Sequence, residues 1–532
     1  MPELRKLALF LVTLLALGAC RAPVGATLPG QPGNPAGSAD APTQALIGNS
    51  GSPLPPSSEA TPSPAFDPTA TPNPLRRPKY TLRAVLDYAR HHLAVDERID
   101  YTNRTPLSIP HLLLIVEPSR YPDVFHLTGL AWADGEPILD YEREVGSLRI
   151  PLSAPLAPGE SIHLEIAYEL SLPSPDPGYY GRPVPFGYSA RQTNLVDWYP
   201  FLPPYVPGGT SQAGATPVEG TAPSGQVSRG NGGSQGWLAH QAGFFGEHLV
   251  FEASDFEVQI RLADARSDLV IAASAPAQTG GGWHTYQHLE ARNFAFSVSD
   301  QYVTSSKTVD GVTIFGYAFP FDAAAGDAAL QATAEALSIY NDLFGPYPHP
   351  TLSVVEADFL DGMEYDGLYF LSKGFYNSYS GGHSDYLIAI AAHETAHQWW
   401  FARVGNDQAV EPWLDEALST YSERVFYENL YPESLDWWWG YRINYYDPSG
   451  WVDGSIYNPG GYRPYRDAVY LNGALFLESL REAVGDQVFF AFLHAYAERF
   501  SGALATGDDF FALLKGFSQE DLTPAIEKYF QN

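Results

Sequence analysis

The chain has 532 residues, with 61 Asp and Glu against 30 Lys and Arg, so its formal net charge is −31. Phosphate binding needs clustered Lys and Arg, and this balance argues against a nucleic-acid partner. The single cysteine, Cys20, excludes internal disulfides. The length is sufficient for two domains with sizeable cores, and the acidic surface favours solubility.

The first residues have the pattern of a signal peptide. A basic pair precedes the apolar run 7–17, which is too short to cross a bilayer core of about 30 Å at about 1.5 Å per residue. The run ends at Leu-Gly-Ala-Cys20, which resembles a bacterial lipobox, where the cysteine receives a lipid and becomes the new amino terminus. We therefore expect residues 1–20 to be a lipoprotein signal and the protein to lie outside the cytoplasm, anchored to a membrane through Cys20. The alternative is a plain secretory signal with an incidental cysteine.

Residues 21–79 are mostly Pro, Ala, Gly, Ser and Thr, with Phe66 as the only aromatic side chain. Such a composition buries too little apolar surface to offset the entropy of ordering. We expect a disordered tether between the anchor and the folded enzyme.

From residue 80 to 305 the pattern indicates an antiparallel β domain. Apolar residues alternate with polar ones at 162–170 and 256–262, as in half-buried strands, and no long helix is predicted before about residue 324. Within this domain, 207–236 is rich in Gly, Ser and Thr and is expected to be a mobile surface loop.

Residues 306–532 are predicted to be mainly helical. We expect a helix at 386–404 capped by Ser384, a helix opened by Pro412, and further elements as follows: helices 324–343, 467–484 and 486–500, and a strand at 352–359. His349 and His383 adjoin Pro or Gly and are interpreted as loop histidines. The aromatic residues at 437–446 are interpreted as packing of the catalytic domain, and the alternative is that they line a peptide or sugar groove.

The run His393-Glu394-Thr395-Ala396-His397 is the strongest chemical signal. Residues four apart share one face of a helix, so two imidazoles can converge on one metal while Glu394 points beside them toward a bound water. Glu416, in the first turn of the next helix, is the natural third ligand, because catalytic zinc takes three protein ligands and keeps a fourth position open. The bland alternative is a helix with two packed histidines and a solvated glutamate.

These residues resemble a known family. HETAH followed by Trp-Leu-Asp-Glu416-Ala is similar to the gluzincin metallopeptidases of the aminopeptidase N type, which carry HExxH and then WLNEG. The family's GxMEN strand is resembled by the segment Asp-Gly362-Met363-Glu364-Tyr. Its YxKGA segment is resembled by Tyr470-Leu-Asn-Gly-Ala. A weaker resemblance extends upstream, so that it covers most of residues 80–532.

The resemblance implies a thermolysin-like catalytic domain behind the β domain, hence a multidomain α+β fold, with one zinc ion per chain. It implies that His393, His397 and Glu416 hold the zinc, that Glu394 is the general base and that Tyr470 stabilises the oxyanion. Glu364, with Met363 and Gly362 beside it, would bind the free α-amine of a peptide substrate.

The chain departs from the family pattern at four positions, none of which removes a ligand, the base or the tyrosine: Asp361, Tyr365, Asp415 and Asn472. Asp366, Asp415, Thr420 and Glu423 are interpreted either as groups that orient the ligands or as solvated residues. The family's second amine anchor is not recognisable, and the chain stops where larger members continue. We therefore expect an open cleft.

We expect a zinc peptidase that is an aminopeptidase with relaxed specificity. Two alternatives stay open from the sequence: a zinc hydrolase of another bond, such as an epoxide, and a non-catalytic binding lipoprotein that retains the fold. The oligomeric state is not predicted.

Overall fold

The computed structural model describes residues 77–174, 185–206, 236–243, 245–264, 266–359, 361–458 and 460–531. The predicted signal peptide, nearly all of the tether and the loop segment 207–235 lie outside these residues and stay predictions. Among the described residues, no helix combines the length and apolar character needed to cross a membrane.

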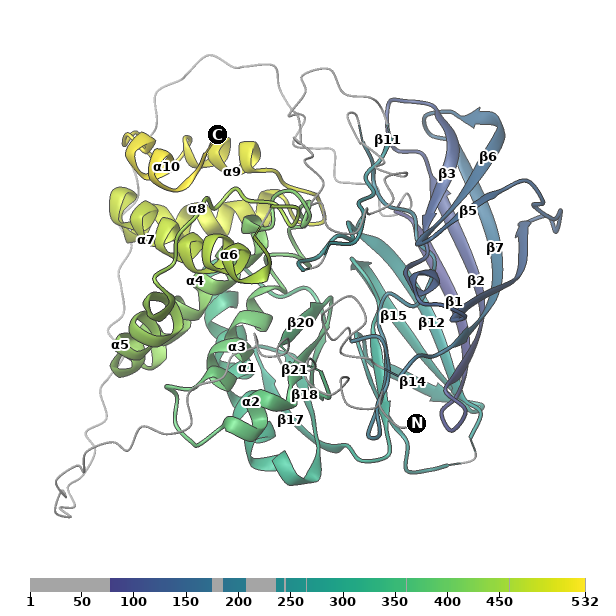
Figure 1. Cartoon of the computed structure of the whole chain (residues 1–532), viewed down its shortest axis with the longest axis horizontal. Helices are drawn as coiled ribbons and strands as arrows, with labels where there is room; N and C mark the ends of the chain where they lie inside the picture. The colour runs from purple at the N-terminus through teal and green to yellow at the C-terminus, as the bar shows by residue number, and fades with distance from the viewer. Residues whose placement is uncertain are drawn as a thin grey trace, which may run out of the picture. The chain divides into compact units, whose positions relative to one another are not determined.

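The first domain is built around a seven-stranded sheet (Figure 1). Its strands, in spatial order, are β14 (Ala277–Gly280), β15 (Trp283–Ala291), β12 (Ser254–Leu262), β1 (Lys79–Asp87), β2 (His92–Thr102), β7 (Ser161–Ser171) and β4 (Phe125–Trp132). All neighbours are antiparallel except β1 and β12, which pair in parallel. The predicted antiparallel domain is therefore confirmed apart from this one pair.

The sheet packs on the core of the domain through every second residue of its strands. In β7, Leu164, Ile166, Tyr168 and Leu170 are buried while the intervening residues are mostly exposed. A buried apolar face and a solvated polar face are what alternation in the sequence predicts.

Smaller sheets complete the domain. They contain β3 (Ile109–Ile115), β6 (Ser147–Leu156) and β5 (Glu142–Glu144); β13 (Val270–Ala273), β16 (Phe296–Ser299), β9 (Thr193–Leu195) and β8 (Gly187–Tyr188); and β10 (Tyr205–Val206) with β11 (Gly236–Trp237).

A five-stranded sheet begins the second domain. Its order is β17 (Val303–Val309), β18 (Val312–Ala318), β19 (Thr351–Ala357), β21 (Leu368–Ser372) and β20 (Gly362–Tyr365), so β17 crosses the expected boundary at residue 305. Every residue of β19 is buried. Leu352 and Val354 pack into the helical core, whereas Val355 and Ala357 pack into the core of the β domain. This sheet is therefore covered on both faces.

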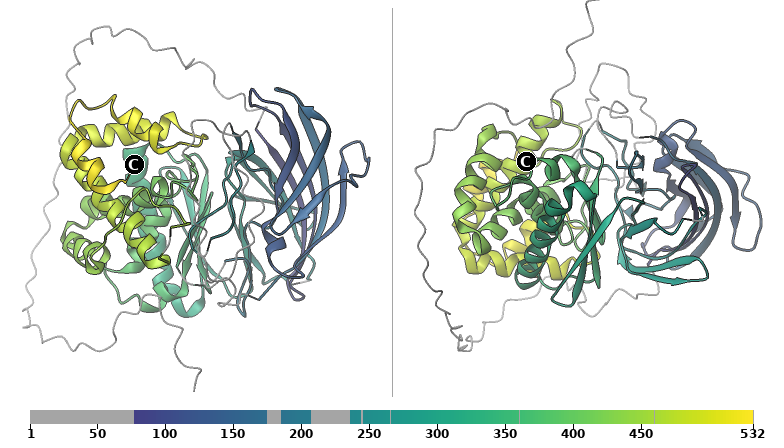
Figure 2. Two further views of the ribbon diagram at one scale, coloured as in Figure 1. Left: turned by 45° about the horizontal axis from the view of Figure 1, so that its top comes forward. Right: turned by 90° about the horizontal axis from the view of Figure 1, so that it is seen from below.

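Helices form the rest of the second domain (Figures 1 and 2). They are α1 (Ala323–Phe344), α2 (Lys373–Ser378), α3 (Tyr386–Ala396), α4 (Trp413–Leu430), α5 (Leu435–Trp437), α6 (Tyr462–Arg466), α7 (Gly473–Val484), α8 (Asp486–Arg499), α9 (Gly507–Leu514) and α10 (Thr523–Tyr529). The long predicted helices are confirmed to within a few residues, with two exceptions.

The helix that carries HETAH is shorter than predicted and has a different cap. The side chain of Asp385, not Ser384, accepts the Leu387 backbone N–H at 2.9 Å, while Ser384 donates to Ser434. The helix ends at Ala396 rather than at residue 404, because the chain then folds into tight turns. In these turns the Trp400 carbonyl meets the His397 ring at 3.1 Å, which a continued helix would not allow.

The predicted helix 467–484 begins as a π-helix, η8 (Asp467–Asn472), before it becomes α7. Wide turns of this kind frequently occur at functional sites. Gly473 at the junction allows close packing, because a Cβ there would lie 2.5 Å from that of Ala417 on α4. Tyr470 is thereby brought next to the helix that carries Glu416.

Candidate metal centre and active site

Three side chains from α3, its terminal turn and α4 converge on one point. The Nε2 atoms of His393 and His397 are 3.1 Å apart, and they lie 3.3 and 3.5 Å from Oε2 of Glu416. Tetrahedral zinc with bonds of about 2.0–2.1 Å separates its ligand atoms by about 3.3 Å. The predicted ligands therefore have the spacing of a zinc site.

Each histidine is oriented through its other ring nitrogen. His393 Nδ1 lies 3.0 Å from Oε1 of Glu423, one of the predicted orienting residues, and His397 Nδ1 lies 3.1 Å from the Trp400 carbonyl. Glu423 also accepts hydrogen bonds from the Arg442 guanidinium and from the indole N–H of Trp438. Partners of this kind fix the ring orientation and the tautomer of a metal ligand.

Sequence reasoning missed Arg442 and Trp438. Neither packing nor a substrate groove, the two roles expected for the aromatic residues at 437–446, includes a hydrogen bond to Glu423, and no local pattern pairs Arg442 with α4. With their hydrogen bonds, both carboxylate oxygens of the buried Glu423 have partners.

Glu394 lies beside the ligands with one oxygen free. It is 4% exposed, and its Oε2 has no hydrogen-bond partner among the described residues. A Cβ at Gly362 would lie 2.0 Å from Glu394 Oε1, so a larger residue there would displace this carboxylate. A buried carboxyl oxygen without a partner is costly, and a bound water or substrate is the group that would satisfy it.

Tyr470 lies against the same ligands. Its ring stacks on the His393 ring with centroids 6.1 Å apart and an angle of 10° between the planes, and its hydroxyl donates to Oε1 of Glu416. Burial, together with the Glu416 charge, raises the pKa of Tyr470 well above its usual range, so the phenol remains a hydrogen-bond donor.

Glu364 reaches the site from β20. A carboxylate oxygen of Glu364, one of Glu394 and a ring nitrogen of His397 lie within 4.8 Å of one another. Gln408 donates to Glu364 at 3.1 Å and to Asp415 at 2.8 Å, a link that no sequence pattern indicated. Met363 is partly buried against the core of the β domain and holds the strand in place.

The pKa shifts of the ionisable side chains indicate that this site favours a bound positive charge. Burial favours the neutral ring of His393, yet the carboxylates of Glu416 and Glu423 raise its pKa to about 9. Burial also favours the neutral form of Glu416, but hydrogen bonds to His393 and His397 lower its pKa to about 2. Burial, with smaller contributions from Glu364 and Glu416, keeps the pKa of Glu394 well above its usual range despite both histidines. Clustered buried carboxylates of this kind suit a divalent cation.

Two of the four candidate orienting residues do not contact a metal ligand. The Thr420 hydroxyl is buried without a hydrogen-bond partner, and Asp366 contacts His288 and His349 instead. Asp415 accepts the backbone N–H of Glu416 at 2.9 Å and so fixes the start of α4.

The catalytic half of the chain has relatives of known type. Residues 328–529 match the peptidase family M1 domain. The chain is 27% identical over 237 residues to Aminopeptidase M1-A of Oryza sativa subsp. japonica, covering 42% of this chain and 27% of that protein. It is 30% identical over 222 residues to Endoplasmic reticulum aminopeptidase 1 of Homo sapiens, covering 39% and 24% respectively. The chain thus spans about a quarter of the length of these relatives.

Solved structures share the fold over most of the chain. The M1 zinc metallopeptidase from Deinococcus radiodurans superimposes with a TM-score of 0.58 at 18% identity, covering 85% of this chain and 92% of that one. A mutant of that enzyme bound to a Tyr-Ser-Ala substrate gives a TM-score of 0.58 at 17% identity, covering 86% and 94%. Residues 328–529 therefore match the peptidase family M1 domain, and the fold of the chain, a β domain followed by a mainly helical domain, is that of the solved M1 zinc metallopeptidases.

Proposed function

We propose that this protein hydrolyses peptide bonds with one catalytic zinc ion per chain and prefers substrates with a free amino terminus. The observation that carries the proposal is the unpartnered Oε2 of buried Glu394, beside three side chains with zinc-ligand spacing. The tripeptide bound to the Deinococcus radiodurans relative supports peptides as the substrate class.

The donor set fits zinc: two imidazoles and one carboxylate would hold the ion and leave a fourth position open. When bound, zinc supplies a Lewis acid that polarises the scissile carbonyl and acidifies water. Glu394 accepts the proton of the attacking water through its free oxygen and delivers it to the leaving amine. Water attack breaks the C–N bond, and the products are a carboxylic acid and an amine.

Tyr470 contributes to the transition state. Its hydroxyl, which donates to Glu416 in this structure, is positioned to turn toward the oxygen that gains negative charge. A hydrogen bond made mainly in the transition state accelerates the reaction rather than tightening substrate binding.

Glu364 supplies the anionic partner for the substrate ammonium. Burial raises the pKa of its carboxyl group, and a cation beside it would stabilise the ionised form. An exposed ion pair is worth about 1 kcal/mol, or about fivefold in rate. Because Glu364 is only 5% exposed, the preference for a free amine should exceed that value.

The test compares a free-amine peptide with its acetylated counterpart in the wild type and in Glu364→Gln. We expect the wild type to prefer the free amine by more than about fivefold, with slower cleavage of the blocked peptide, and the variant to lose the preference. Asp361→Asn is the matched control, since Asp361 begins the same segment but is exposed and bonds Tyr462. Equal rates on both peptides in the wild type would contradict the amine-binding role.

We also propose that Cys20 carries a lipid that anchors the enzyme to a membrane outside the cytoplasm. The lipobox-like sequence and the composition of residues 21–79 support this placement. The wild type should fractionate with membranes and Cys20→Ser should not, while both hydrolyse peptides equally. Recovery of the wild type in the soluble fraction after gentle lysis would contradict the anchor.

A further inference from the structure

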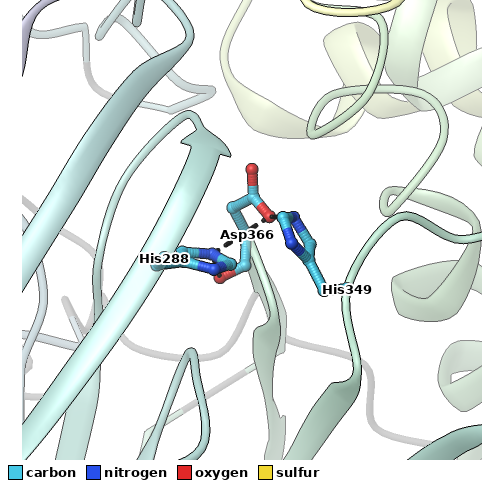
Figure 3. Close-up of side chains that lie close together, drawn as sticks. All are labelled: His288, His349 and Asp366. Atoms are coloured by element: carbon cyan, nitrogen blue, oxygen red, sulfur yellow. Dashed lines mark hydrogen bonds and ion pairs between the residues drawn. The ribbon is translucent and has the colours of Figure 1, made fainter. Parts of the chain in front are cut away.

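A second cluster of two histidines and a carboxylate lies away from the HETAH helix. His288 belongs to β15 of the β domain, His349 to the loop before β19, and Asp366 to the turn between β20 and β21. Figure 3 shows both imidazoles directed at one carboxylate oxygen. His288 and Asp366 are buried, and His349 is at the edge, with a side chain 9% exposed.

The spacing of this cluster resembles that of the catalytic ligands. Asp366 Oδ1 lies 2.9 Å from His349 Nε2 and 3.2 Å from His288 Nε2, and the three ligand atoms lie within 4.8 Å of one another. The corresponding carboxylate-to-imidazole distances at Glu416 are 3.3 and 3.5 Å. Both sets lie near the separation of about 3.3 Å between ligands of tetrahedral zinc.

The oxygen at the centre of the cluster, Asp366 Oδ1, lies within ion-pair distance of both imidazole nitrogens. Neither contact has hydrogen-bond geometry, and this oxygen has no hydrogen bond among the described residues. The other oxygen accepts the backbone N–H of Arg292 at 2.8 Å, and the Asp366 N–H donates to Asn293. His288 Nε2 also lies 3.1 Å from the Asp366 carbonyl oxygen. A buried anionic oxygen without a hydrogen bond points to a missing cation.

The guanidinium of Arg292, whose backbone N–H bonds Asp366, is itself hydrogen-bonded elsewhere. Among the described residues, this guanidinium donates to backbone carbonyls alone, those of Phe251, Ala402, Arg403 and Ala503.

We propose that His288, His349 and Asp366 form a second, structural site for a divalent transition metal, with zinc as the expected ion. Two imidazoles and one carboxylate favour zinc over calcium or magnesium, which take oxygen ligands. The His349 side chain, which is 9% exposed, gives solvent access for a water as the fourth ligand.

Such a metal would tie together three segments that meet at the substrate strand. Asp366 lies two residues after Glu364, just past the end of β20, and on its other side the Gly367 N–H donates to Gln398, which follows HETAH directly. The Gln398 amide in turn donates to the Tyr365 carbonyl at 3.0 Å. The proposed ion therefore links the β domain to the turn that follows β20, the strand that carries Glu364.

Metal analysis of the full chain after zinc loading and gel filtration tests the proposal. We expect about two zinc ions per chain in the wild type, about one in His349→Ala and in His393→Gln, and none in the double variant. His383→Ala is the matched control, because this loop histidine stacks on Tyr431 and belongs to neither cluster. It should retain both ions.

Thermal unfolding gives the second measurement. In the His393→Gln background, added zinc should raise the Tm by several degrees, and further replacement of His349 by Ala should remove that shift. One zinc in the wild type that persists in His349→Ala and is lost in His393→Gln would overturn the second site. One zinc lost only in His349→Ala would overturn the catalytic site instead, so the two failures are distinguishable.

Discussion

Two clusters in this chain offer the same donors, two imidazoles and one carboxylate, but they differ in what surrounds those donors. Around Glu416 lie Glu394 with a free oxygen, the Tyr470 hydroxyl and Glu364. Around Asp366 the partners beyond the two histidines are the backbone N–H of Arg292 and the side chain of Asn293. The donor set is thus sufficient for metal binding, whereas hydrolysis also needs a nearby group that can take a proton and another that can donate to an oxyanion.

Replacing Glu394 by Gln should make the catalytic cluster behave like the structural one, with metal but without turnover. Gln has the same shape and cannot accept the water's proton, so turnover should fall about 10²- to 10⁴-fold. Zinc content should be unchanged, because Glu394 is not among the three converging ligands. Peptide turnover and metal analysis on the same sample measure both effects, and wild-type turnover in the variant would contradict the role of Glu394.

Removal of the Tyr470 hydroxyl takes away the second group that distinguishes the clusters. Tyr470→Phe should lower kcat about 10²- to 10³-fold with a much smaller change in KM. Tyr465→Phe is the control, since that ring packs edge-on against Tyr470 with centroids 5.9 Å apart. Steady-state kinetics decide the matter: an unchanged kcat in Tyr470→Phe would reduce this residue to a packing role.

Substitution of Gly362 tests whether the position of the general base Glu394 matters as much as its presence. An added methyl group would meet the Glu394 carboxylate at 2.0 Å and displace it. Since a shift of about 1 Å can cost about 100-fold in rate, Gly362→Ala should lose activity on that scale. Gly440→Ala is the matched control, because a Cβ at that position has no atom within 4 Å. Equal activity of the two variants would show that Glu394 tolerates displacement.

Glu423 tests the support behind the catalytic ligands. Glu423→Gln should weaken zinc binding at that cluster about 10- to 100-fold, because His393 loses its charged partner. Glu428→Gln on the same helix is the control: Glu428 pairs with Arg424 and Arg481 and contacts no ligand. Competition with a chelator measures the affinity, and equal values for the two variants would show that Glu423 does not support the metal.

The two clusters also differ in how far the sequence could predict them. His393, His397 and Glu416 lie on α3, its terminal turn and the following helix α4, so the spacing within each helix and the short connection between them predicted the convergence. Glu423 lies seven residues after Glu416 and so shares its helix face. His288, His349 and Asp366 come from a strand, a loop and a turn far apart in the chain, and no local period connects them.

The sequence also predicts local elements of the fold better than contacts between distant segments. Period-two burial predicted the strands of the β domain, yet the parallel pairing of β1 with β12 depends on which distant strands meet. The helix around HETAH was predicted too long because its apolar composition continues through Trp399 and Trp400, which are buried in turns instead. Similarly, Gln408 reaches Glu364 only through tertiary packing.

Diffraction data collected from a crystal of the wild-type protein at the zinc absorption edge test the central claim most directly. We predict a strong anomalous peak between His393, His397 and Glu416, next to the free oxygen of Glu394, and a second peak between His288, His349 and Asp366. Absence of the second peak would remove the structural site and leave the catalytic one intact. Absence of the first from zinc-loaded, peptide-hydrolysing protein would contradict the assignment of the HETAH cluster as the catalytic metal centre.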